Sequence, residues 1–130
     1  MTTEIWWLAA VSLATALMWI PSTLALMREQ GMTTALGNRD DLGALSPWAA
    51  RAKRAHENAV HNLVLFAAVV LAAHAAGATG AATATATMVY FWARIVHYLS
   101  YAFGVIGVRT LAFAAGWVAT IRIGWAVVAG

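Results

Sequence analysis

Five polar side chains that could bind an anion lie at the polar start of an otherwise apolar segment. With about 100° of rotation per residue, they fall within a sector of about 100° on one face of a helix. Polar groups at membrane depth usually face a bundle interior or a wet cavity. We therefore expect this face, named here the first polar stripe, to form one wall of a ligand pocket. Its members are Arg51, Arg54, Asn58, His61 and Asn62.

A second polar stripe lies further along the chain, at spacings of four, three and four residues. Its members, Tyr90, Arg94, His97 and Tyr101, occupy a sector of about 60° on a helix. Arg94 lies about 15 Å from the nearer end of that helix, where an unpaired guanidinium is costly. One interpretation is structural: the two stripes satisfy each other, for instance through a bond from Arg94 to Asn62 or Tyr90.

The other interpretation is an anion site, because positive charge accumulates with little to balance it. Arg109 and Thr110 begin the last apolar run on the same side as the two stripes. Four arginines then converge, and Glu57 is the only carboxylate nearby. The planar fork of arginine suits carboxylates and phosphates, so this pattern predicts an anionic ligand.

Composition places these residues in a membrane protein. Of 130 residues, 62% are hydrophobic and 10% are charged, and the mean hydropathy is +0.73. A soluble domain carries about a quarter charged residues, and a core of this size could not bury so much apolar surface. The net charge of +3 does not indicate a nucleic-acid partner, because the cations form no dense run. The chain has no cysteine, and its four histidines form no tight pair, so we expect no metal site.

Apolar runs and helix breakers predict an all-α, integral membrane four-helix bundle in a single domain, residues 1–130. We expect membrane-spanning helices at about 5–27, 47–76, 81–103 and 109–128. Pro21 should kink the first helix, and glycines should end the second and third. A long loop precedes the second helix, which should begin at Ser46-Pro47.

Cation placement predicts the orientation in the membrane. Arg28, Arg39, Arg51, Lys53 and Arg54 lie in the first loop and at the start of the second helix, whereas the loop at 77–80 carries no cation. The positive-inside rule then places the polar stripes on the cytoplasmic side and both termini away from the cytoplasm. We expect a multi-pass protein of the bacterial inner membrane, in contact with membrane lipids.

Three motifs resemble the MAPEG family (membrane-associated proteins in eicosanoid and glutathione metabolism), in its bacterial type. They are RAxRAHxNxxxN before an apolar run, ARxxHxxxY, and an arginine with a hydroxyl residue opening the last helix. The resemblance covers nearly the whole chain. It implies a homotrimer that binds glutathione between subunits near the cytoplasmic side.

The resemblance also implies roles for single residues. Arg51, Arg54 and Asn58 match glutathione-contacting positions, Arg94, His97 and Tyr101 match the third-helix motif, and Arg109 matches an arginine beside the thiol. Thr110 stands where some members have serine. His61 replaces a glutamate that helps to bind the cationic end of the ligand, and Asn62 completes the expected glutathione-binding set.

The expected activity is a glutathione transferase or peroxidase that acts on a lipophilic small molecule. Arg109 would lower the thiol pKa of glutathione by placing positive charge beside it, and Tyr101 would donate a hydrogen bond. The alternative is a non-catalytic trimeric protein that binds lipids or a partner on the same scaffold. A transporter or channel is a weaker alternative, because the spans show no broken midplane segments.

Overall fold

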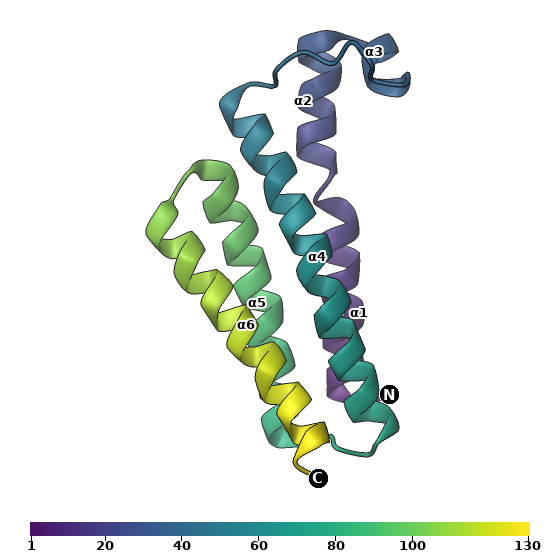
Figure 1. The fold of residues 1–130 in the computed structure, drawn as a ribbon, viewed down its shortest axis with the longest axis vertical. Helices are drawn as coiled ribbons and strands as arrows, with labels where there is room; N and C mark the ends of the chain where they lie inside the picture. Colours follow the sequence, from purple (N-terminus) through teal and green to yellow (C-terminus); the bar gives the residue numbers. More distant parts are fainter.

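The chain folds into helices only, as a computed structural model of residues 1–130 shows (Figure 1). α5 packs against α6, α4 and α1, and α4 also packs against α6 and α1. The two termini lie at the same end of the molecule (Figure 1). The helices are α1 (Thr3–Leu17), α2 (Ile20–Gln30), α3 (Met32–Leu36), α4 (Pro47–Ala75), α5 (Ala81–Phe103) and α6 (Ile106–Val128).

Three helical segments are long and apolar enough to cross a membrane: Thr3–Gln30, Pro47–Ala75 and Ile106–Val128. They make the chain an integral membrane protein by length and composition. α5 has the same length as α6, 23 residues, but Arg94, His97 and several threonines lower its hydropathy. A fourth crossing, by α5, therefore stays a prediction.

The first predicted helix is two helices in the structure. α1 ends at Leu17 and α2 begins at Ile20, so the expected kink at Pro21 is instead a break just before it. Proline has no N–H to donate and fits the first turn of a helix, which explains why the chain restarts here. The hydroxyl of Tyr98 in α5 donates to the carbonyl of Met18 at 2.9 Å, so the break has a partner in the bundle.

The long loop between α2 and α4 is anchored at both ends and contains a helix that the sequence analysis did not predict, α3. The side-chain amide of Gln30 donates to the carbonyl of Gly43 at 2.9 Å and accepts from its N–H at 2.8 Å. The Ser46 N–H donates to the carboxylate of Glu29 at 3.0 Å. α4 then begins at Pro47, and the Ser46 side chain makes no capping bond, in contrast to the capping role expected for it.

The turn between α5 and α6 is tighter than predicted. Gly104 adopts a left-handed conformation (φ 76°) and ends α5, which glycine does at little steric cost. The Val105 N–H donates back to the carbonyl of Ser100 at 2.8 Å. α6 therefore begins at Ile106 rather than at about 109, and Arg109 completes its first turn, with its N–H donating to the carbonyl of Val105 at 3.2 Å.

The core differs between the two ends of the bundle. In the half that holds the termini, large side chains pack together, and the rings of Phe66 and Tyr90 stack with centroids 3.6 Å apart. In the half that holds Arg51, Arg94 and Arg109, the inner face of α4 consists of alanines. Four of them are at most 2% exposed: Ala49, Ala52, Ala55 and Ala59. Small residues allow helices to approach closely, so this half of α4 lies tightly against its neighbours.

Candidate functional site

Arg94 is the point at which the two polar stripes meet. Its side chain is 2% exposed, and one terminal nitrogen, Nη2, donates to Asn58 Oδ1 at 2.6 Å. The same nitrogen lies 3.3 Å from His97 Nδ1. Asn62 supports Asn58 by donating to its backbone carbonyl at 2.8 Å and to Oδ1 at 3.3 Å. The partner of Arg94 is thus Asn58, and not Asn62 or Tyr90 as the structural interpretation suggested.

One buried nitrogen of Arg94 is left without a partner. Nε makes no hydrogen bond, and neither does the buried hydroxyl of Tyr90 one turn earlier. Both side chains pack beside Gly116 of α6, where an added Cβ would lie 3.7 Å from each of them. Buried polar groups normally find partners, so two orphaned groups on one face of α5 mark this region as one that can accept another polar atom.

The rest of the first polar stripe is divided between the bundle and the surface. Arg51 is half-buried, and its Nε donates to the carbonyl of Ala102 at 3.1 Å, so it caps the end of α5. Arg54 and His61 are exposed. Within one chain the stripe therefore lines no enclosed wall, because Arg54 and His61 reach the surface while Asn58 bonds the buried Arg94.

The expected catalytic pair is in contact. The guanidinium carbon of Arg109 lies 4.5 Å from the centre of the Tyr101 ring, in a cation–π arrangement. The ring of His97 meets that of Tyr101 edge-on, with centroids 5.7 Å apart. Thr110, in contrast, is exposed, and its hydroxyl donates to the carbonyl of Ile106 in its own helix at 3.1 Å. The structure brings Arg94, His97, Tyr101 and Arg109 together and leaves Thr110 outside.

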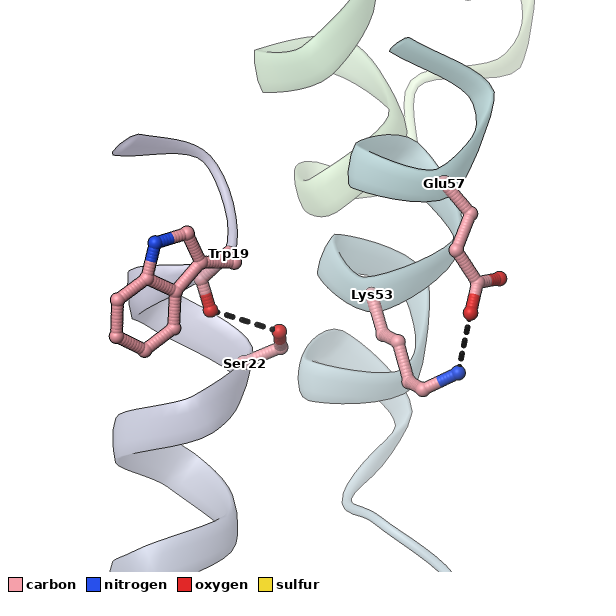
Figure 2. A network of polar contacts seen from close by, with 4 residues as sticks. All are labelled: Trp19, Ser22, Lys53 and Glu57. Atoms are coloured by element: carbon pink, nitrogen blue, oxygen red, sulfur yellow. Dashed lines mark hydrogen bonds and ion pairs between the residues drawn. The ribbon is translucent and has the colours of Figure 1, made fainter. Parts of the chain in front are cut away.

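No carboxylate balances this group of arginines. Glu57 forms an ion pair with Lys53 on the part of α4 that lies beside Ser22 of α2 and Trp19, the residue just before α2 (Figure 2). This is the one salt bridge of the chain. Glu57 is therefore paired with Lys53. The positive charge of the four arginines has no acidic partner within one subunit.

One buried acidic residue, Glu4, escaped the sequence analysis and lies at the opposite end of the molecule. Glu4 is 3% exposed, accepts a hydrogen bond from the Thr83 hydroxyl at 2.6 Å and lies 3.2 Å from the Gly80 N–H. It thereby joins the start of α1 to the first turn of α5, where a negative charge is favoured by the helix dipole. The only signal for this contact was an acidic residue directly before an apolar run.

A protein-family model, MAPEG family, matches residues 5–129. The chain belongs to the MAPEG family. No curated protein and no solved structure matches it. The resemblance drawn from the three motifs is confirmed, and membership makes the chain an integral membrane protein from a family associated with eicosanoid and glutathione metabolism.

As a MAPEG protein, the chain offers donors and positive charge at one end of its bundle rather than a nucleophile of its own. It has no cysteine, and no three His, Asp or Glu side chains lie close enough together to hold a metal ion. Arginine and tyrosine donors can orient carboxylates and stabilise an anion. The arrangement can therefore bind and polarise an anionic reactant.

Proposed function

We propose that this MAPEG protein is a glutathione-dependent transferase or peroxidase that acts on lipophilic electrophiles. The observation that supports the proposal most is the set of four arginines near one end of the bundle with no carboxylate partner. Arg94 is buried, and the other three arginines are at least partly exposed. Positive charge gathered around a buried guanidinium without a counter-ion is costly, so this set favours an anionic ligand. The members are Arg51, Arg54, Arg94 and Arg109.

Glutathione fits the anionic side of this site. Its carboxylates need planar donors, and Arg54 is exposed while Nε of the buried Arg94 lacks a partner. Its ammonium group needs a carboxylate, which one subunit does not offer, because Glu57 is paired with Lys53 and His61 stands where the family glutamate would be. The chain should therefore bind glutathione less tightly than a site with that glutamate.

Each residue of the site has a separate role in this proposal. Bound glutathione would supply the thiol sulfur that attacks the electrophile. Arg109 places positive charge beside that sulfur and so favours loss of the thiol proton. Tyr101 holds Arg109 over its ring and donates its hydroxyl proton as a hydrogen bond to the sulfur. Arg51, Arg54 and Arg94 orient the carboxylates, with Asn58 fixing the direction of Arg94.

The remaining glutathione-binding positions and the assembly are part of the same proposal. His61, Asn62 and His97 complete the ligand site within one subunit, and a homotrimer supplies the surfaces that one subunit lacks. Thr110, which lies outside the group within one chain, would contribute across a subunit interface. The protein lies in a bacterial inner membrane with both termini away from the cytoplasm, and the lipophilic substrate enters from the bilayer. Native mass spectrometry in a mild detergent tests the assembly: a trimer is expected, and a monomer in several detergents contradicts a site between subunits.

Ultraviolet absorbance of the thiolate on adding glutathione to the purified protein tests the chemistry. We expect a thiolate signal with the wild type and its loss in Arg109→Gln, with glutathione binding retained in calorimetry. Arg39→Gln, which removes an arginine of the α2–α4 loop, is the matched control and should keep the signal. A wild type that binds glutathione without forming the thiolate contradicts the proposed chemistry.

A second candidate function is a non-catalytic trimer that binds lipids or a partner. Two observations favour it: Arg109 is held against Tyr101 rather than free, and exposed His61 provides no counter-charge for the glutathione ammonium. Absence of both binding and thiolate at saturating glutathione would select this candidate.

A further inference from the structure

A long apolar groove runs along the outer faces of α5 and α6, away from the polar stripes. Two cavities form it, of about 480 Å³ and about 400 Å³. They share Val89 and Ala115, so they are continuous. The groove extends from Ala82 to Val96 along α5, a rise of about 21 Å at 1.5 Å per residue. We name it the α5–α6 groove.

One charged residue lines this groove, and it stands at one end. Arg122 of α6 is exposed and belongs to the cavity nearer the chain termini, whereas the other cavity is lined by hydrophobic residues alone. Neither α5 nor α6 contains an acidic residue, and Arg122 forms no salt bridge. Trp125, one turn further along α6, is exposed, as expected where a helix reaches the headgroup level.

These features match an amphiphile with an anionic head. The hydrocarbon core of a bilayer is about 30 Å thick, so a groove of about 21 Å is long enough for one acyl chain of a single leaflet. The guanidinium at the end of the groove suits the phosphate of the headgroup. The head and the chain of such a lipid would therefore meet matching chemistry at the same time.

A second copy of the chain is a poorer occupant of the groove. It would bury Arg122, and an uncompensated charge in an interface is costly. The one acidic side chain at this end of the molecule, Glu4, is itself buried and bonded to Thr83, so another subunit has no free acidic side chain to offer here. A lipid supplies the missing negative charge.

We propose that the α5–α6 groove is a binding site for an anionic phospholipid of the leaflet nearer the chain termini. One acyl chain lies in the groove and the phosphate contacts Arg122. The site is separate from the glutathione site and does not depend on the proposed enzyme activity, because none of the four converging arginines lines it.

Native mass spectrometry of delipidated protein, titrated with phosphatidylglycerol or phosphatidylcholine, tests the site. We expect the wild type to retain phosphatidylglycerol in preference to phosphatidylcholine. Arg122→Gln should weaken phosphatidylglycerol binding about five-fold, which corresponds to the attraction of about 1 kcal/mol between one basic residue and an anionic surface. Arg28→Gln, which removes an exposed cation at the opposite end, should leave the preference unchanged.

A second variant tests the acyl-chain part of the groove. Ala115→Leu fills the point where the two cavities meet, on an exposed position of α6, and should weaken binding of both lipids. Glycerol phosphate without acyl chains should not bind. Equal binding of the two lipids, no effect of Arg122→Gln, or equally tight binding of glycerol phosphate would each overturn the proposal.

The absence of native cysteine allows a direct check of what covers the groove. A spin label at Ala115→Cys should be reached by a lipid-soluble relaxation agent, and excess phosphatidylglycerol should reduce that access. Disulfide formation between two such chains would show that a second copy covers the groove, and the lipid proposal would then be wrong.

Discussion

The bond between Asn58 and Arg94 leads to a counterintuitive prediction: removing the asparagine should destabilise the protein more than removing the arginine. Asn58→Ala deletes the oxygen that accepts from Nη2 of Arg94 at 2.6 Å. The guanidinium, 2% exposed, keeps only the contact of 3.3 Å with His97, and its Nε already lacks a partner. Arg94→Leu instead removes the charge together with its need for partners.

The expected magnitudes follow from the burial of this pair. A hydrogen bond to a charged group contributes about 1.5–3 kcal/mol, and removing one partner leaves the other charge unsatisfied. Replacing a buried charge by an apolar side chain of similar volume is often neutral. We therefore expect Asn58→Ala to lower the free energy of unfolding by about 1.5–3 kcal/mol relative to its control, and Arg94→Leu to lower it by less than about 1 kcal/mol.

The control is Asn62→Ala, on the same helix and one turn away. It has the same gain in helix propensity, so that gain cancels in the comparison. Asn62 makes no hydrogen bond to Arg94; it donates to the backbone carbonyl of Asn58 at 2.8 Å and, over a longer distance, to Asn58 Oδ1 at 3.3 Å. Unfolding in mixed micelles with rising denaturing detergent, followed by the fluorescence of the seven tryptophans, measures all three variants and the Asn58→Ala/Arg94→Leu pair.

The pair should be no less stable than Arg94→Leu alone, because asparagine has no charge left to satisfy. If Asn58→Ala is as mild as Asn62→Ala, or if Arg94→Leu is the most destabilising variant, the bond does not stabilise the bundle as argued. Arg94→Leu should in either case lose anionic ligand binding while it keeps the oligomeric state of the wild type.

Three further predictions concern other parts of the molecule. Gly104→Ala should lower the free energy of unfolding by about 1–2 kcal/mol, because its φ of 76° is strained for alanine. Gly116→Ala should raise it by up to about 1 kcal/mol, since the added Cβ would meet its three nearest neighbours at 3.7 Å, an ordinary contact distance. The same unfolding assay measures both variants, and the opposite order of stability would contradict the geometry. Glu4→Leu should cost about 1 kcal/mol, not more, because the Thr83 hydroxyl can turn to the carbonyl of Gly80 at 2.9 Å; a loss of the fold would mean that Glu4 does more than join two helices. His61→Glu should tighten glutathione binding by about 1–3 kcal/mol in calorimetry, and equal or weaker binding would argue against glutathione as the ligand.

The sequence alone indicated the all-helical class, the membrane setting and the family, because each depends on local chemistry. Apolar runs and their glycine or proline ends are readable in the chain, as in the glycines around 77–80 that separate α4 from α5. The early start of α6 at Ile106 was missed because glycine at 107 reads as a breaker. In the structure, Gly107 is part of the first turn, and Gly104 alone makes the reversal.

Side-chain partners were less accessible to sequence reasoning. Periodicity put Asn58 and Arg94 on facing stripes, but a choice between Asn58 and Asn62 requires the relative height of two helices to within one turn. That height depends on how closely α4 and α5 pack. The contact of Glu4 with Thr83 could not be predicted for the same reason, since it joins α1 to the first turn of α5 between residues 79 positions apart in the chain.

The alanine face of α4 has a consequence for how the site can respond to a ligand. Alanine has no side-chain rotamers, so the inner surface formed by Ala49, Ala52, Ala55 and Ala59 has no alternative arrangements to sample. A larger core could absorb a change at Asn58 or Arg94 by repacking its side chains one at a time. With only alanines on this face, α4 would have to shift or tilt as a rigid body. A rearrangement at the arginines would therefore act along the length of α4, towards the Gly77–Gly80 turn at its other end.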